Sequence, residues 1–483
     1  YYTGTVTGLP FGSSYHHLEI SSGDWTLSAP LTVNGNLTVS GGTLDGNTGG
    51  PYGITVRGNV DFTGATAFSN PGLLTFDSGG AQNFLPGTMS CGDVETSGAG
   101  TEVYQIDTAT VANLTVGAGN VYALDGSSAA ATLRVLNGGA VSNGGAFRVA
   151  DAANTVTLEA NSGTIGYSGN DIDYNGNSIH LGGLDTYGPA VLLGAGEEIV
   201  LDTGCVFGST IDLDGAGASL SLAGNTLTAG GKVTVSAGSG GTVTVGTGNL
   251  DASGYALEIR SGGTLETSGT VSCAGLTVNS GGDIDNLGAN TLYASGSVDV
   301  SGTYTTPGNG SIEMGGSGVS LYSAVTLGDL TVDSAGTVTV VTGALTVGGG
   351  LTILNGELAT GSQDLTMGGL TDIDGTLTFS NGSGTNVLDC NGNVDADGAL
   401  TITGSADARF AGANVDITGG SLSANTSTVT FDATATTQSF DLNGSSLHDL
   451  TINNTNGTPT VTAASTVDVL GSLTRTAGDL AMG

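Results

Sequence analysis

Four aspartates recur in two pairs along the C-terminal half of the sequence: Asp372 and Asp374, and then Asp395 and Asp397. If each pair belongs to one coil of a stacked structure, equivalent carboxylates lie about 5 Å apart and repel each other. A hard cation that prefers oxygen ligands, such as Ca²⁺, would relieve this repulsion. The spacing therefore predicts that these four side chains bind Ca²⁺. We expect no cofactor to be required, and Ca²⁺ is the only candidate ion.

The same aspartates have a purely structural interpretation. Each pair is followed by glycine, and Asp-Gly is typical of corner turns in solvent, where no ion is needed. Asp416 continues the column after Asp395 at a similar interval. The sequence leaves the metal site and the turn as alternatives.

A second acidic motif spans residues 171–176, Asp-Ile-Asp-Tyr-Asn-Gly. It matches the first half of the helix–loop–helix calcium motif, D-x-D-x-N-G. The twelfth position, however, is Gly182 where that motif requires glutamate. The motif is therefore not of that type, and a calcium-binding turn without helices remains an alternative.

Catalytic groupings are missing from the sequence. It has no G-x-S-x-G motif, no P-loop and no histidines at metal-binding spacing. Its basic residues, which a lyase would need to stabilise a developing negative charge, are spread along the chain: Arg57, Arg134, Arg148, Lys232, Arg260, Arg409 and Arg475. We therefore expect that the protein is not an enzyme.

A short recurring motif, apolar–Thr–apolar, which we call the strand phrase, predicts the β-strands on which these residues would lie. It begins at Leu330, Leu351, Leu377, Leu400, Val429, Leu450 and Leu473. A nearly fixed period of this size marks a repeat fold, and alternation with period two marks half-buried strands. The phrase predicts an all-β fold, a right-handed parallel β-helix (β-solenoid) of about 24 residues per coil and about 19 coils.

Composition supports this fold and excludes some partners. Glycine supplies 87 of 483 residues, which suits many tight turns. With 7 basic and 43 acidic residues, the net charge is −36. Such a surface repels nucleic acid and anionic membranes, so we expect no nucleic-acid partner. No apolar run approaches the length of a membrane-spanning helix, so we also expect no membrane span.

The four cysteines are far apart in the sequence: Cys91, Cys205, Cys273 and Cys390. Each is several predicted coils from the next, which is further than the roughly 7 Å between Cα atoms that a disulfide tolerates. We therefore predict four unpaired, buried cysteines that act as small apolar side chains.

The two ends of the sequence differ from its middle. Residues 1–30 concentrate aromatic side chains and read as a cap or a subunit-joining segment, whereas 31–483 read as one continuous solenoid with an uncapped C-terminal end. We expect a processed chain that forms part of something longer. The predicted interface residues are Tyr1, Tyr2, Phe11, Tyr15 and Trp25 at one end and Leu473, Leu480 and Met482 at the other.

Three further stretches carry a resemblance to a known group of proteins. They are Ser-Thr-Val-Thr-Phe-Asp at 427–432, Leu-His-Asp-Leu-Thr-Ile-Asn-Asn at 447–454 and Val-Asp-Val-Leu-Gly-Ser-Leu-Thr at 467–474. Their order resembles the repeats of bacterial surface and secreted β-helical proteins, the filamentous-haemagglutinin-like and autotransporter-adhesin-like types. The resemblance implies a right-handed parallel β-helix, export from the cell and a structural or adhesive role, but no particular binding residue.

These observations favour a structural extracellular protein, at the cell surface or secreted, that assembles head to tail into a filament or fibre. Its expected partner is another copy of itself. One alternative is a monomeric rod-like adhesin that binds surface glycans or a host or abiotic surface. The other is a polysaccharide-degrading β-helix enzyme.

Overall fold

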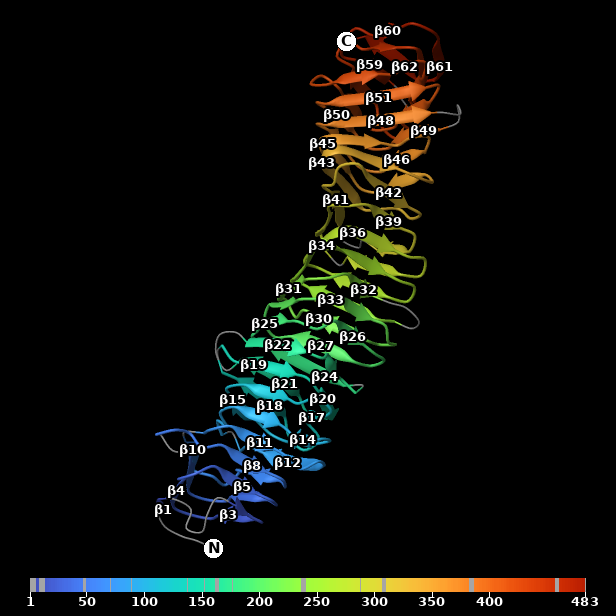
Figure 1. Ribbon diagram of the computed structural model, residues 1–483. Helices are drawn as coiled ribbons and strands as arrows, with labels where there is room; N and C mark the ends of the chain where they lie inside the picture. The colour runs from blue at the N-terminus through green and yellow to red at the C-terminus, as the bar shows by residue number, and fades with distance from the viewer. Residues whose placement is uncertain are drawn as a thin grey trace. The chain divides into compact units, whose positions relative to one another are not determined.

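The computed structural model describes residues 6–7, 14–46, 49–69, 71–87, 89–136, 138–151, 153–160, 165–175, 177–235, 240–286, 288–305, 310–381, 386–456 and 460–482. Within these ranges the chain is all β, with parallel strands stacked coil upon coil as a β-solenoid (Figure 1). They contain no helix long and apolar enough to cross a membrane. The chain divides into two compact units, Tyr1–Asn249 and Leu250–Gly483.

The strands form where the sequence alternates apolar and small polar residues. In Leu31-Thr32-Val33 the two apolar side chains are buried and the threonine faces outward. The same pattern holds at Leu345-Thr346-Val347. β-Branched and apolar residues of this spacing fit a pleated, half-buried surface, which confirms the predicted strand phrase.

Unit 1 contains four groups of strands. The first is β1 (Val6–Thr7), β4 (Asp24–Thr26), β7 (Thr43–Asp45) and β10 (Ala67–Ser69). The second is β3 (Leu18–Ile20), β6 (Leu37–Val39), β9 (Val60–Asp61), β12 (Ala81–Leu85), β14 (Glu102–Gln105), β17 (Val121–Asp125), β20 (Ala146–Asp151) and β23 (Ile172–Asp173). The third is β15 (Ala109–Val111), β18 (Ala131–Val135), β21 (Val156–Ala160), β24 (Ser178–Gly182), β27 (Glu198–Leu201), β30 (Ser219–Ser221) and β33 (Thr242–Gly246). The fourth is β2 (Ser14–Tyr15), β5 (Leu31–Val33), β8 (Ile54–Val56), β11 (Leu74–Phe76), β13 (Val94–Thr96), β16 (Leu114–Val116), β19 (Ala140–Asn143), β22 (Ile165–Gly169), β25 (Leu184–Tyr187), β26 (Val191–Leu193), β28 (Cys205–Phe207), β29 (Ile211–Leu213), β31 (Thr226–Ala229) and β32 (Val233–Val235).

Unit 2 begins at the second residue of β34 (Asn249–Ile259). Its first strands are β35 (Thr264–Thr267), β36 (Thr270–Val278), β37 (Asp283–Asn286), β38 (Thr291–Ala294), β39 (Val298–Val300), β40 (Thr303–Thr305), β41 (Ser311–Met314), β42 (Val319–Ser323) and β43 (Asp329–Val340). One face is then formed by β44 (Leu345–Val347), β46 (Leu365–Met367), β49 (Val387–Cys390), β52 (Asp407–Phe410), β55 (Thr428–Phe431), β58 (Asp449–Asn453) and β61 (Leu473–Ala477). The remaining strands are β45 (Leu351–Ala359), β47 (Thr371–Ile373), β48 (Thr376–Asn381), β50 (Val394–Ala396), β51 (Ala399–Gly404), β53 (Asn414–Asp416), β54 (Ser421–Ser423), β56 (Gln438–Asp441), β57 (Ser446–Leu447), β59 (Thr460–Ala463), β60 (Asp468–Val469) and β62 (Asp479–Met482).

Each coil has about 21 residues, and the solenoid has about 21 turns, so the coils are shorter and more numerous than predicted. The prediction treated every apolar–Thr–apolar phrase as the same strand of successive coils. Leu351 in fact pairs with Thr371, and the phrase at Leu377 belongs to β48, a different strand of the coil. The number of residues between successive phrases is therefore not always the length of one coil. Where two phrases lie on different strands of the coil, their separation exceeds one coil, and the average period is overestimated.

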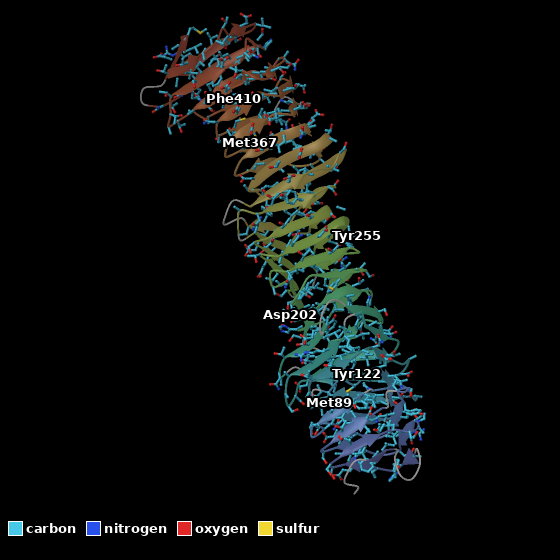
Figure 2. All side chains as sticks on the ribbon, turned by 90° about the vertical axis from the view of Figure 1, so that its left-hand side faces the viewer. Met89, Tyr122, Asp202, Tyr255, Met367 and Phe410 are labelled. Atoms are coloured by element: carbon cyan, nitrogen blue, oxygen red, sulfur yellow. The ribbon has the colours of Figure 1, made fainter. Side chains whose placement is uncertain are left out.

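Stacked aromatic rings occupy part of the core in both units. In unit 1 the rings of Tyr167 and Tyr187 stack with their centroids 4.7 Å apart, and in unit 2 those of Phe431 and Phe440 are 4.3 Å apart. Tyr122 and Phe410, labelled in Figure 2, belong to the same two series of rings. Such offset pairs add to the stabilisation that burial of apolar area already provides.

All four cysteines are buried and none of them forms a disulfide, as predicted. Burial raises the pKa of the Cys91 thiol to about 12, with a smaller contribution from Asp107, and burial raises that of Cys273 to about 12. These thiols are therefore protonated near neutral pH and act as small apolar side chains.

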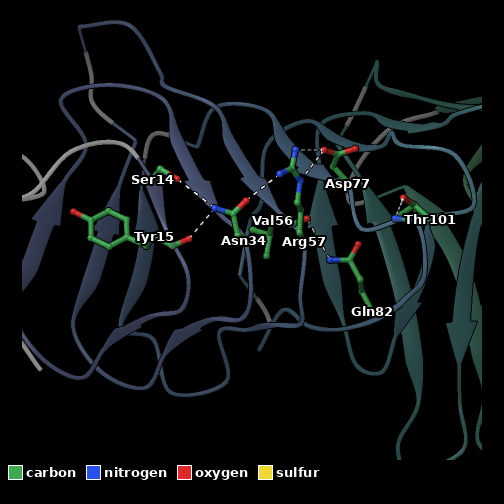
Figure 3. Close-up of polar contacts among 9 residues, drawn as sticks. Ser14, Tyr15, Asn34, Val56, Arg57, Asp77, Gln82 and Thr101 are labelled. Atoms are coloured by element: carbon green, nitrogen blue, oxygen red, sulfur yellow. Dashed lines mark hydrogen bonds and ion pairs between the residues drawn. The ribbon is translucent and has the colours of Figure 1, made fainter.

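Polar side chains tie neighbouring coils together at the corners of unit 1 (Figure 3). The Asn34 side-chain amide donates to the Ser14 hydroxyl at 3.3 Å, and Arg57 donates to Asn34 Oδ1 at 2.9 Å. Arg57 also pairs with Asp77 at 3.1 Å, one coil further on. Because these groups are partly solvated, they contribute little energy, and the main-chain ladders and apolar core supply most of the stability.

Candidate functional site

The predicted column of aspartates is present on the outer face of unit 2. Asp372 on β47 lies in register with Asp395 on β50, which lies in register with Asp416 on β53. The column continues to Asp441 on β56, which the sequence reasoning did not include. Alternation along the strands turns the neighbouring Ile373 into the core and the carboxylate of Asp372 outward.

Neighbouring negative charges affect the protonation of this column. The pKa of Asp372 is raised, first because its carboxylate is partly buried and then because the charges of Asp374, Asp395 and Asp397 repel its own. The pKa of Asp416 is lowered instead, because the hydroxyl and backbone N–H of Thr418 donate to its Oδ1 at 2.7 and 3.0 Å. Repulsion between carboxylates is therefore felt at Asp372, whereas hydrogen bonds stabilise the ionised carboxylate at Asp416.

A groove of about 690 Å³ runs beside the aspartates along the corner of unit 2. Asp374 and Asp397 line it, one on each of two successive coils, together with Asn355 at the equivalent place one coil earlier. The Asn355 side-chain amide donates to Asp333 Oδ1 at 2.6 Å. The groove therefore offers carboxylate oxygens at its edge and main-chain groups along its length.

The floor of this groove is a column of glycines, of which Gly375, Gly398 and Gly420 are in the groove lining. A Cβ atom on Gly398 would lie 1.9 Å from the carbonyl oxygen of Gly375, and one on Gly420 would lie 2.0 Å from that of Gly398. No side chain fits in such a contact. The coils therefore approach each other closely at this corner, which gives the Asp-Gly sequences a structural reason apart from any ion.

The predicted metal ligands do not converge on one point as the structure stands. Among the described residues, no three His, Cys, Asp or Glu side chains are grouped in a way that could hold a metal ion. The role of Asp372, Asp374, Asp395 and Asp397 in binding Ca²⁺ remains a prediction.

The last coil of unit 2 exposes apolar side chains that occupy core positions. Leu473 on β61 is 59% exposed, whereas Leu450, its register partner on β58, is 1% exposed. Met482 on β62 is 60% exposed, whereas its partner Ala463 on β59 is 1% exposed. These positions are open because no described coil lies above them.

Two other leucines of the last coil differ in exposure. Leu480, a predicted interface residue, is half-buried, and Leu470, which the sequence reasoning did not single out, is 75% exposed. We call Leu470, Leu473 and Met482 the apolar end. Leu473 and Met482 lie on two different strands, so only the strand register reveals that both occupy core positions, whereas Leu470 directly follows β60.

The predicted N-terminal interface residues are only partly within the described ranges. Tyr1, Tyr2 and Phe11 lie outside them. Tyr15 is half-buried, and Trp25 is almost completely buried, with its indole N–H donating to the carbonyl oxygen of Ser22 at 2.9 Å. Trp25 thus belongs to the core of the first coils, and the role of this segment in an interface remains a prediction.

The second acidic motif lies on unit 1 at a pocket of about 370 Å³. Asp171, Asp173 and Tyr174 of the motif line it, and so do Leu192 and Glu197 from the following coil. Asp173 forms an ion pair with Arg148 at 2.7 Å, which engages one of the two motif carboxylates. Leu192 and Glu197 carry no sequence signal, because the variable turn lengths conceal which residues become neighbours one coil later.

No family model, no curated protein and no solved structure matches this chain. The resemblance to bacterial β-helical surface proteins is therefore supported only at the level of the parallel β-solenoid.

Proposed function

We propose that this protein is a structural extracellular protein that assembles head to tail into a filament or fibre. The observation that carries the proposal is the apolar end. Leu473 and Met482 stand at positions whose register partners on the coil before, Leu450 and Ala463, are buried in the core. A further β-coil stacked on this end would remove those side chains from water, and a second copy of the chain provides such a coil.

The exposed area of the apolar end sets how much free energy its burial would contribute to assembly. The side chains are 75%, 59% and 60% exposed at Leu470, Leu473 and Met482. Complete burial of such a side chain is worth about 2 kcal/mol, so covering all three would contribute about 4 kcal/mol. Main-chain hydrogen bonds along the open strands would add to this, because an unpaired strand edge is a template for another strand.

The direction of assembly follows from the polarity of the coils. A contact between the last coil of one copy and the first coil of the next uses two different surfaces. Contacts of this kind repeat without limit unless a rotation closes them into a ring, and they therefore generate filaments. The aromatic segment at the start of the chain is the expected partner of the apolar end.

The test compares variants at and away from the apolar end. Leu473→Glu places a charge in the proposed joint and should weaken assembly at least tenfold, measured as the concentration dependence of the sedimentation coefficient. Leu370→Glu is the matched control, because Leu370 is similarly exposed, 52%, but lies before β47 on the side of unit 2. Equal assembly by both variants, or a monomeric parent chain at high concentration, would refute the proposal.

A second candidate function draws on the groove of unit 2. A rod-like adhesin would bind a glycan through its side, and the groove beside Asp374 and Asp397 has room for a short polar chain. Glycan-array binding that Asp397→Asn abolishes and Leu473→Glu leaves intact would favour this candidate over the filament.

A further inference from the structure

A column of core residues runs along one face of unit 2 and ends in a charged side chain. In successive coils from β44 to β58 the members of this column are apolar, each in register with the next and at most 1% exposed: Val347, Met367, Cys390, Phe410, Phe431 and Ile452. The next register partner, on β61 of the last described coil, is Arg475 (Figure 1). A charged residue therefore occupies a position at which the preceding coils bury an apolar side chain.

The register of β61 places Arg475 at the core position itself. Leu473, Thr474 and Arg475 stay in step with three residues of β58 on the preceding coil, and the register shifts only after Arg475. Because side chains alternate along a strand, Arg475 shares its face of the strand with Leu473 of the apolar end. A coil stacked on this end would therefore cover Leu473 and Arg475 together.

The guanidinium of Arg475 is bound within its own coil. Its Nη2 lies 2.6 Å from Asp479 Oδ1, across the turn that joins β61 to β62. Its Nε donates a hydrogen bond to the carbonyl oxygen of Gly478 in that turn. Both charged side chains are exposed, so the ion pair contributes little to stability while water surrounds it.

Stacking another coil on the apolar end would change this balance. The charged pair would lose its water, and removing an ion pair from water costs free energy that the attraction between the two charges often fails to recover. An apolar residue at position 475 would have no such cost, and its own burial would favour the stacking. Arg475 therefore opposes the contact that Leu473 and Met482 favour.

We propose that the Arg475–Asp479 ion pair is a gatekeeper that limits head-to-tail stacking at the apolar end. Its role rests on the proposed function, because the contact that it limits is the head-to-tail contact. A covering coil fits better if its facing strand offers oxygen atoms to the guanidinium, which has five N–H donors. Inward-pointing charges also protect open sheet edges against indiscriminate addition. The gatekeeper thus disfavours the aggregation of exposed cores more than it disfavours a matched coil.

A simpler role for the ion pair would be to fasten β62 to β61. In that case an apolar residue in place of Arg475 would loosen the last coil and weaken assembly. Net charge leads to the same expectation, since the chain has a charge of −36 and two copies without Arg475 would repel each other more strongly. The gatekeeper predicts the opposite sign, so one variant distinguishes these roles.

The experiment measures the concentration at which half of the full-length chain is assembled, from the concentration dependence of its sedimentation coefficient. Arg475→Ile continues the apolar column, as Ile452 does on the coil before, and should lower this concentration at least tenfold. Arg409→Ile is the matched control, because Arg409 is exposed on the outer side of β52, where it pairs with Asp407 at 2.8 Å. It should leave the concentration nearly unchanged. Circular dichroism shows whether each variant is folded.

Asp479→Asn tests the ion pair itself. Without Asp479 the charge of Arg475 would be uncompensated in the joint, so the concentration for half-assembly should rise at least tenfold, although the chain becomes less negative. A lower concentration would show that net charge governs assembly and would overturn the gatekeeper. In the Arg475→Ile background, Asp479→Asn should have almost no effect. Leu473→Glu added to Arg475→Ile should return the chain to the monomer, because assembly uses the apolar end.

The outcomes distinguish the gatekeeper from the filament. If the parent chain stays monomeric and Arg475→Ile assembles, the gatekeeper is supported and the proposed filament is refuted. If the parent chain assembles and Arg475→Ile requires the same or a higher concentration, the gatekeeper is overturned and the filament stands. If neither chain assembles at any concentration, both proposals are wrong.

Discussion

Replacing Gly398 with alanine tests the close stacking of coils at the corner of unit 2. The added Cβ would lie 1.9 Å from the carbonyl oxygen of Gly375 and 2.4 Å from that of Asp374. Both contacts are with backbone, so no side-chain rotation can relieve them, and the coils must separate locally. Overpacking of a rigid site usually costs about 1–3 kcal/mol. We expect a loss of about 3 kcal/mol in the free energy of unfolding, at the upper end of that range.

The assay is urea unfolding followed by circular dichroism, with Gly254→Ala as the matched control. A Cβ on Gly254 would meet nothing within 4 Å, and its backbone does not require glycine. Alanine there should be neutral or should stabilise by up to about 1 kcal/mol, because it restricts the unfolded chain. Repeat proteins can unfold in stages. We therefore compare the urea midpoints of the first unfolding transition that occurs in both variants. Equal midpoints for Gly398→Ala and Gly254→Ala would refute the proposed register of the coils.

Three further predictions concern the ionisable groups. If the aspartate column binds Ca²⁺, calcium should raise the melting temperature of the parent chain, and the double variant Asp372→Asn, Asp395→Asn should lose that increase; an equal response of both proteins would contradict the metal site. Because the pKa of Asp372 is raised in the folded state, this group favours folding at acid pH, and that contribution disappears as the pH rises through its folded pKa. Asp372→Asn should therefore be more stable than the parent at pH 7 in the absence of calcium, with the difference vanishing below about pH 3, and a constant difference across this range would show that charge is not the cause. The buried thiols of Cys91 and Cys273 should not react with a thiol reagent at pH 8 until urea unfolds the chain, and fast labelling of the native protein would contradict their burial.

The strands could be predicted from the sequence because their alternation is local. Leu351-Thr352-Ile353 carries its pattern within one short phrase, and the structure places it on β45 with the threonine outward. The aspartate column could also be predicted, since Asp372 and Asp395 hold the same offset from their strands and lie on neighbouring coils. Local pattern and constant offset are both visible in one sequence.

The coil length and the pocket lined by Asp171 and Glu197 could not be predicted, for one physical reason. The turns between strands vary in length, so equal phrases such as those at Leu351 and Leu377 fall on different strands of the coil. The same variation conceals that Tyr187 and Glu197 reach the side of Asp171. Such neighbours depend on which strands pair, which the sequence pattern alone leaves undetermined.

Electron microscopy of the purified chain in negative stain, at near-neutral pH, is the most direct test of head-to-tail assembly. Assembly through the apolar end predicts uniform filaments whose length grows with protein concentration and which Leu473→Glu forms only at a protein concentration at least tenfold higher, if at all. Dispersed single molecules at every concentration, for the parent chain and the variant alike, would contradict self-assembly.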